Sequence, residues 1–295
     1  MELRHIRYFL AVADEGSFTR AAERLGIAQP PLSQQIRALE QELGVLLFRR
    51  VPRGAVLSDA GQAFYREVQG LPLQVDLATR EAQFAARGET GALRVGFTGA
   101  AGLYPVVQDG LRRFRRQYPQ VELSLEEANT SLLIRRLEER VLDVAFIRAT
   151  EQHAQDFAVR QVAREPMVAV LPAEHPLAVR GELALSDLRG EAFILTPRHV
   201  GPSSYDTVVL ACRAAGFEPI LGQLAPQMLS VISLVSVGLG VSVVPGVMRS
   251  VQLTGSRFLD VLDGPVIDLS VAHRRDNHSK VLDNFLDLVN AHSFE

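Results

Sequence analysis

The sequence is poor in the features that define several common classes of protein. It has a single cysteine, Cys212, so it can form neither an internal disulfide nor a cysteine-based metal cluster. Cys212 is either a reactive thiol or, beside Ala211 and Ala214, a small buried apolar residue, and its neighbours favour the second reading. No apolar run approaches the roughly 18 residues of a membrane span. The charged start without a small-residue cleavage site is unlike a signal peptide, so we expect a cytoplasmic protein.

The motifs of common enzyme classes are also missing. The chain has 7 histidines, and none stands at metal-binding spacing with a partner, as in HExxH. There is no GxSxG elbow, no P-loop and no GxGxxG following a strand. We therefore expect no catalytic residue, no metal site and no cofactor.

The net charge of −3 does not make the chain a polycation. A local basic surface is what nucleic-acid binding requires, so the total does not exclude it. Lysine and arginine together number 31, and Lys280 is the one lysine. Arginine suits bidentate contacts to bases and phosphates, but a codon bias explains the imbalance equally well.

The first 58 residues have the pattern of three short helices. Apolar residues at helical spacing predict the first helix: Leu3, Ile6, Phe9, Leu10 and Ala13. Gly16 ends it, and Ser17 is a good N-cap for a second helix that stops at Gly26. A third helix ends at Gly44, and one of its faces is apolar: Leu32, Ile36, Leu39 and Leu43.

The third helix begins with two prolines, Pro30 and Pro31. Proline is tolerated at the first helical position because its missing N–H would be unpaired there anyway, so the pair predicts a sharp helix start. With the leucines turned inward, Ser33, Gln34 and Arg37 project outward near that start. This is the arrangement of a helix-turn-helix, in which the second helix reads base edges in the major groove. The alternative is a helical hairpin with a solvated polar face.

The segment LLFRRVPRGAVLSDAG predicts a β-hairpin whose tip carries Arg49, Arg50 and Arg53. Three arginines beside a candidate recognition helix are typical of the wing of a winged helix-turn-helix, which contacts phosphates or a narrow minor groove. A solvated charged turn is the alternative.

Residues 59–87 have the pattern of one long helix. Its apolar positions alternate at spacings of four and three: Phe64, Val68, Leu71, Val75, Ala78, Ala82 and Ala85. This seam indicates a helix–helix dimer contact, although a helix packed on its own domain would show it too. Pro72 predicts a kink or a break, and the segment RGETGA that follows predicts a flexible hinge.

From residue 91 strands alternate with helices. ALRVGF, VELSLEEA and VAFIR read as strands separated by helices over LYPVVQDGLRRFRRQYP and SLLIRRLEERVLD, which gives β-α-β-α-β. MVAVLPAEHPLA, EAFILT and GVSVVP supply further strands. Two doubly wound α/β halves with a ligand in the crevice beyond the strand ends are the expected architecture.

The residues 1–61 and, more loosely, the segments GALRVGFTG, LDVAFIR, HPLA and GLGVSVVP closely resemble the LysR-type bacterial transcriptional regulators. IAQPPLSQQI with GFTGA is most similar to the branch that controls catabolism of aromatic compounds. The resemblance implies an α/β protein with a winged helix-turn-helix (1–58), a dimerisation linker helix and hinge (59–90), and a two-subdomain, periplasmic-binding-protein-like effector domain (91–295). It further implies a homotetramer, built as a dimer of dimers, that bridges promoter DNA sites and acts with RNA polymerase as an activator.

The resemblance also assigns site residues. The expected contacts with double-stranded DNA are Gln29, Pro30, Pro31, Ser33, Gln34, Arg37, Arg50, Arg53 and Ser58. The expected effector site consists of Thr98, Gly99, Ala100, Asn129, Thr130, Arg148, Pro202, Ser203 and Ser204. Relatives often have arginine where Gln34 stands and serine where Ala100 stands.

The chemistry of the effector residues points to an anion. Helices expected after Gly102 and after Ser204 would aim their N–H groups into one crevice, and Arg148 adds a charge suited to a carboxylate. We expect a small aromatic or dicarboxylate effector; an ordinary structural arginine is the alternative for Arg148. A solute-binding transport protein would need an export signal and would leave the first sixty residues unexplained.

Overall fold

The computed structural model describes residues 1–52 and 54–290. The chain forms two compact units, residues 1–83 and 84–295, which we describe separately. None of the helices in these described ranges is long and apolar enough to cross a lipid bilayer.

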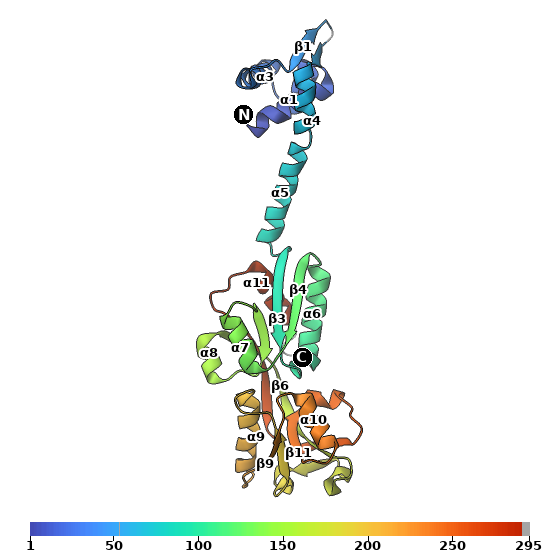
Figure 1. Ribbon diagram of the computed structural model, residues 1–295, viewed down its shortest axis with the longest axis vertical. Helices are drawn as coiled ribbons and strands as arrows, with labels where there is room; N and C mark the ends of the chain where they lie inside the picture. Colours follow the sequence, from blue (N-terminus) through green and yellow to red (C-terminus); the bar gives the residue numbers. More distant parts are fainter. Residues whose placement is uncertain (53, 291–295) are drawn as a thin grey trace. The chain divides into compact units, whose positions relative to one another are not determined.

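The first unit begins with the three predicted helices, α1 (Leu3–Glu15), α2 (Phe18–Leu25) and α3 (Gln29–Leu43) (Figure 1). Each ends at the predicted glycine: Gly16, Gly26 and Gly44 have φ of 59°, 67° and 71°. Glycine adopts this left-handed conformation without a Cβ penalty, so it ends a helix cleanly. Ser17 caps α2 as expected, since its Oγ accepts a hydrogen bond from the Arg20 amide at 3.4 Å.

The apolar faces of these helices form one core with the hairpin behind them. Phe9, Leu32, Ile36 and Leu39 are buried, and β1 (Phe48–Val51) pairs antiparallel with β2 (Gly54–Leu57). The predicted hairpin is therefore confirmed. A Cβ on Gly54 would lie 2.2 Å from the Gly16 carbonyl oxygen, so this close approach of the hairpin to the α1–α2 turn requires glycine.

The linker is two helices, α4 (Asp59–Val68) and α5 (Leu71–Ala86), and not one. The break falls just before Pro72, which lies in the first turn of α5, where its missing N–H costs no hydrogen bond. Phe64 packs on Phe9 with ring centroids 5.0 Å apart. The first part of the apolar seam thus packs on its own domain, whereas from Val75 onward it is exposed.

The RGETGA segment, expected as a hinge, is a turn followed by the start of a strand. Gly91 and Ala92 already belong to β3 (Gly91–Phe97). Asn284 donates a hydrogen bond from Nδ2 to the Arg87 carbonyl at 2.8 Å. A Cβ on Gly88 would lie 2.7 Å from the backbone of Lys280 and Val281, so α11 (Lys280–Asn290) closely confines this turn.

The second unit contains two lobes joined by β6 (Ala158–Pro172), which runs through both, and by the chain connection that enters β12 (Val266–His273). The first lobe comprises residues 91–165 and 266–290, and the second lobe residues 166–265. In the first lobe β4 (Val121–Glu127), β3 and β5 (Val144–Ile147) are parallel, and β12 (Val266–His273) and β6 (Ala158–Pro172) continue the sheet antiparallel. The predicted β-α-β-α-β unit is present, but β12 returns from the far end of the chain.

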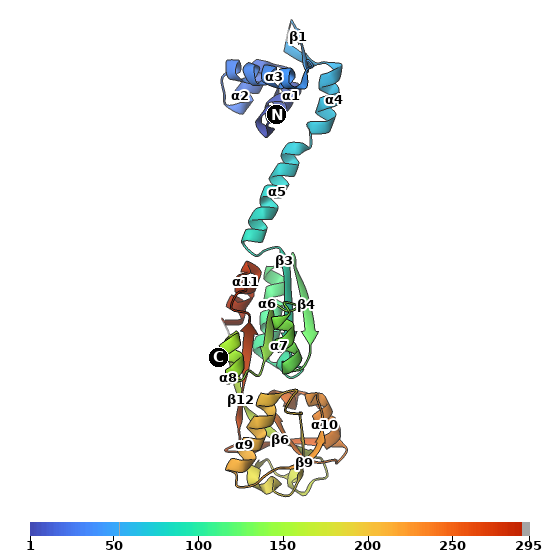
Figure 2. The same ribbon diagram turned by 60° about the vertical axis from the view of Figure 1, so that its left-hand side comes forward.

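Helices cover both faces of the first-lobe sheet (Figures 1 and 2). On one face α6 (Pro105–Gln117) packs on α11, where the rings of Phe114 and Phe285 meet edge to face at 5.3 Å. On the other face α7 (Thr130–Glu138) and the segment after α8 (Glu151–Asp156) bury Leu133, Leu137 and Phe157.

The second lobe is built on the far half of β6, between β10 (Ser242–Pro245) and β11 (Ser256–Leu262). The short β7 (Glu182–Ala184) extends one edge, and β8 (Ala192–Leu195) and β9 (Ile220–Leu224) extend the other. Helices α9 (Pro202–Ala214) and α10 (Met228–Ser236) belong to separate cores. The 3-10 turns are η1 (Ala101–Leu103), η2 (Pro176–Val179), η3 (Leu185–Leu188) and η4 (Gly246–Ser250). The stretch PAEHPLA, expected within a strand, contains the η2 turn.

Candidate functional site

The exposed start of α3 is the first candidate site. Gln29, Pro30, Pro31, Gln34 and Arg37 are exposed. Ser33 is half-buried, and its Oγ lies 2.7 Å from Nε2 of Gln29, which donates to it. These polar side chains sit opposite the buried leucine face, so α3 presents them as a connected row at its first turns.

The helix begins one residue earlier than the proline argument predicts. Ala28 is the N-cap, and Gln29 is the first helical residue. Pro30 and Pro31 therefore occupy the second and third positions, which still lie among the first four residues, whose N–H groups have no partner inside a helix. The two prolines therefore still cost the helix no hydrogen bond, although they stand one position further into it than predicted.

The wing lies beside this row. The main chain of Arg49 and Arg50 pairs with Val56 and Ala55, and Arg49 is exposed. The side chain of Arg50 and the whole of Arg53 lie outside the described part of the chain. Glu40 of α3 accepts hydrogen bonds at Oε1 from the amides of Leu47 and Phe48, at 2.8 and 3.1 Å, which joins the start of the wing to the recognition helix.

Between α3 and β1 the surface forms a groove of about 1000 Å³, counting the part open to solvent. Arg37 and Arg49 are among the residues that line it. Ser58 is less available than its prediction as a DNA contact assumes. It caps α4 by accepting from the Gly61 amide at 2.9 Å, and it donates to the Leu46 carbonyl at 2.6 Å.

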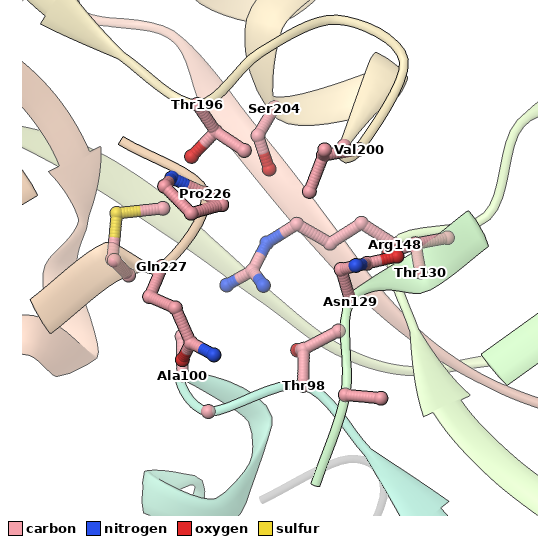
Figure 3. A pocket seen from close by; sticks show the side chains of 14 residues that line it. Thr98, Ala100, Asn129, Thr130, Arg148, Thr196, Val200, Ser204, Pro226 and Gln227 are labelled. Carbon is pink, nitrogen blue, oxygen red and sulfur yellow. The ribbon is translucent and has the colours of Figure 1, made fainter. Parts of the chain in front are cut away.

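A cleft between the two lobes is the second candidate site (Figure 3). Its volume, counting the open part, is about 470 Å³. Seven of the nine residues predicted for the effector site line it: Thr98, Gly99, Ala100, Asn129, Thr130, Arg148 and Ser204. The other lining residues were not predicted from the sequence: Ala128, Thr196, Val200, Gly201, Pro226, Gln227 and Met228.

The first-lobe wall follows the rule for parallel sheets. Thr98, Ala128 and Arg148 come directly after β3, β4 and β5, whose carboxyl ends meet at one edge. The second-lobe wall comes from the residue after β8 and from the starts of α9 and α10. A proline before an apolar helix pattern, in APQMLSV, was the available signal for Gln227 and Met228.

Pro202 and Ser203 do not line the cleft, contrary to the prediction. The helix α9 starts at Pro202, with Gly201 as its N-cap, so these residues and Ser204 lie inside its first turn. Successive helical residues point about 100° apart, so Ser204 faces the cleft when its two predecessors do not.

Arg148 dominates the chemistry of the cleft. Its side chain reaches from the end of β5 into the middle of the pocket (Figure 3), although the residue is only 4% exposed. Burial lowers the pKa of its guanidinium to about 10, which leaves it charged at neutral pH. Its Nε has no hydrogen-bond partner among the described residues, and neither has the buried Thr98 Oγ1 in the same wall. A buried cation with an unused donor is costly unless an anion binds it.

Behind Arg148 a chain of hydrogen bonds leads to the junction of the lobes. Arg148 Nη2 donates to the Tyr104 hydroxyl at 3.4 Å, and that hydroxyl donates to Glu165 Oε1. Glu165 Oε2 accepts from the Val247 amide at 2.7 Å. Burial raises the pKa of Glu165 to about 7, against the lowering effect of the Val247 bond. Its carboxyl therefore links Tyr104, the N-cap of α6 in the first lobe, to Val247 of η4 in the second.

Three helices begin at the cleft. Asn129 caps α7 through its Oδ1, which accepts from the Leu132 amide at 2.9 Å. The N-caps of α9 and α10, Gly201 and Gln227, form no side-chain cap bond. The positive ends of three helix dipoles and one guanidinium therefore face the same cleft, an arrangement that favours negative charge there.

Cys212 and possible metal ligands are the other groups that the sequence raised. Cys212 is fully buried, and burial raises the pKa of its thiol to about 11, so it is a protonated core residue. In residues 1–52 and 54–290 no group of three or more His, Cys, Asp or Glu side chains is placed to hold a metal ion.

The chain matches two family models. The bacterial regulatory helix-turn-helix model of the lysR family covers residues 3–62, and the LysR substrate binding domain covers residues 86–293. The uncharacterized HTH-type transcriptional regulator YnfL of Escherichia coli is 40% identical over 89% of this chain and 88% of its own. The regulator BudR of Raoultella terrigena is 37% identical over 98% of this chain and 100% of its own. Full-length CbnR, crystallised with its target DNA, superposes with a TM-score of 0.83 at 26% identity, covering 99% of this chain and 100% of that one.

Proposed function

The chain belongs to the LysR family of DNA-binding transcriptional regulators and is not an enzyme, and from this premise we propose that a small carboxylate bound in its cleft controls its action at a promoter. In this proposal residues 1–58 read DNA, residues 59–90 mediate dimerisation, and residues 91–295 bind the effector. We propose activation, through RNA polymerase, as the outcome.

The buried guanidinium of Arg148 carries the effector proposal. It is a desolvated cation aimed into a cleft, with an unused donor and no carboxylate among the residues that line that cleft. An effector carboxylate would supply the missing partner, and the first turns of α9 and α10 would add N–H donors.

The choice between aromatic and other acids is the finer part of the proposal. The segments IAQPPLSQQI and GFTGA resemble the aromatic-catabolism branch. The described residues that line the cleft include no Phe, Tyr or Trp side chain to stack on a ring. A panel must therefore include short aliphatic acids beside benzoate and muconate.

Isothermal titration calorimetry with benzoate, muconate, succinate and acetate tests the carboxylate proposal. We expect at least one acid to bind with one site per chain and to lose affinity in Arg148→Ala. Binding confined to neutral sugars or to cations would contradict it.

For DNA, we propose that Gln29, Ser33, Gln34 and Arg37 face the major groove and that Arg49, Arg50 and Arg53 contact phosphates. The exposed row on α3 and the antiparallel hairpin beside it support this assignment. A mobility-shift assay with the DNA upstream of the gene tests it. Failure of the folded protein to shift this fragment, with effector supplied, would reject the operator proposal.

For assembly, we propose a dimer through α5, and a dimer of dimers through further contacts. Val75, in the apolar seam, is 37% exposed, and no described residue of α5 is buried. Val75→Asp places a charge in the seam and should dissociate the pair, whereas Thr79→Asp, outside the seam, should not. Sedimentation velocity distinguishes the two results.

A further inference from the structure

One hydroxyl connects the two lobes at the rim of the cleft. Ser131 Oγ donates to the His199 carbonyl at 2.8 Å and lies 3.4 Å from the Val200 carbonyl oxygen. Ser131 stands in the first turn of α7, in the first lobe, and the two carbonyls belong to the loop before α9, in the second. The contact therefore joins the lobes at residues that lie outside β6, the strand that both lobes share, and outside β12.

The neighbours of this contact form part of the pocket wall. Thr130, directly before Ser131, lines the pocket, and so does Val200, whose carbonyl Ser131 approaches (Figure 3). An increase in the separation of the lobes at this rim would lengthen the Ser131 hydrogen bond. The bond is thus coupled to whether the rim is open or closed.

The loop that carries the two carbonyls is tied to α9. The amides of Val200 and Gly201 both donate to the Pro197 carbonyl, at 2.9 and 3.1 Å. Arg198 forms a bidentate ion pair with Asp206 of α9, at 2.7 and 3.0 Å. These bonds connect the loop to the first two turns of α9, which also carry Ser204 of the pocket wall.

We propose that Ser131 is a positioning residue whose hydroxyl holds the rim closed and so retains the effector. The inference rests on the proposed effector function of the cleft. Since the acceptors are main-chain carbonyls, the bond requires a hydroxyl at position 131 and no particular side chain at 199 or 200. Retention through a closed rim acts on the dissociation rate more than on the association rate.

Hydrogen–deuterium exchange of the full-length protein without effector tests the contact by itself. Ser131→Ala removes the hydroxyl and keeps a strong helix former, while Asn129 still caps α7. We expect faster exchange of the Val200 and Gly201 amides in Ser131→Ala, and wild-type exchange in Ser131→Thr. Ser236→Ala is the matched control, because Ser236 Oγ donates only within its own helix, to the Ser233 carbonyl at 2.8 Å.

Unchanged exchange at Val200 and Gly201 in a folded Ser131→Ala protein would overturn the proposal. Ser131→Thr exchanging as fast as Ser131→Ala would also count against a role for the hydroxyl. A general loss of stability would instead raise exchange throughout the second unit, and that result would identify Ser131 as an ordinary structural residue.

Stopped-flow binding tests retention, with whichever of benzoate, muconate, succinate and acetate binds the wild type. We expect Ser131→Ala to raise the dissociation rate roughly fivefold, the typical net effect of one hydrogen bond, with little change in association. Equal dissociation rates would overturn the retention role. If none of the four acids binds the wild type, the carboxylate proposal fails, and the exchange experiment still decides whether the rim contact exists.

Discussion

The two candidate sites use arginine in opposite ways. On α3 and the wing, Arg37 and Arg49 are exposed and lie on a groove open to solvent. In the cleft, Arg148 is 4% exposed, and within the described residues its guanidinium donates a hydrogen bond to the Tyr104 hydroxyl. Arginine side chains are thus exposed to solvent at the first site and buried at the second.

In the proposed function this difference follows from the size of the partner that each site binds. DNA brings an extended array of phosphates, so exposed arginines act together, and salt screens their contribution. A small anion offers one or two charges, so its site must strengthen each contact by excluding water. Substitutions at the two kinds of arginine should therefore have different consequences for binding.

Arg148→Ala should abolish the effector response. Truncating one partner of a buried, hydrogen-bonded charge pair costs about 2–5 kcal/mol, so effector affinity should fall roughly 100-fold or more. DNA binding should be unchanged, as measured by mobility shift. Arg180→Ala, which removes an exposed arginine paired with Asp187 in the second lobe, is the control. Loss of DNA binding by a folded Arg148→Ala protein would show that the site is assigned wrongly.

Arg37→Ala, or Gln34→Ala, should weaken binding to the operator by about 1–3 kcal/mol for each lost base contact. The loss of affinity should be smaller for unrelated DNA, so the ratio of operator affinity to unrelated-DNA affinity should decrease. Fluorescence anisotropy with both DNA fragments measures it. Gln41→Ala, in the last turn of the same helix, should have no effect. An equal loss on both fragments would place these side chains on phosphates.

Arg53→Ala should lower the affinity of the protein for operator DNA and for unrelated DNA by similar factors. A phosphate contact carries no sequence information, and its removal should lower the slope of log K against log salt by about 1. Titrations at several salt concentrations give this slope. A loss restricted to the operator would mean that Arg53 reads a base or the shape of a groove.

Glu165 should make the stability of the protein depend on pH. Its pKa is raised to about 7 from 4.5, so between these values the folded state binds a proton that the unfolded state lacks. The stabilisation is complete below about pH 4.5 and is lost as the pH rises through 7. Glu165→Gln mimics the protonated form and removes this dependence.

Urea unfolding of both proteins at several values between pH 5 and 8 measures the effect. We expect the free energy of unfolding of the wild type to fall relative to that of Glu165→Gln as the pH rises, because the buried Glu165 carboxyl ionises. The titration of the other groups is the same in both proteins, so it cancels in the difference. A constant difference across this range would mean that Glu165 is ionised throughout.

Local patterns were enough to predict the helix-turn-helix. The three helices, their terminal glycines and the hairpin follow from nearby residues, since capping and amphipathic spacing are local properties. The break before Pro72 was predicted from a single residue. The sequence did not predict that the first part of the apolar seam packs on its own domain while the rest is exposed. Whether Phe64 contacts Phe9 or a second chain depends on residues that are distant in sequence.

The cleft was predicted on one side more fully than on the other. The first-lobe residues follow parallel strands, so a general rule for such sheets locates them. The second-lobe wall includes Gln227 and Met228, which lie far along the chain from Thr98. Their approach depends on β6 running through both lobes and on β12 returning to the first, and no short sequence pattern encodes that pairing.

The sequence by itself determined the family, the helix-turn-helix and the position of Arg148 directly after a strand, because these depend on motifs and on local periodicity. Tertiary structure alone decided that Arg148 is desolvated, that Tyr104 and Glu165 stand behind it, and that Ser131 spans the rim. Burial and hydrogen bonding across lobes arise from contacts between distant segments, and those contacts exist only once the chain has folded.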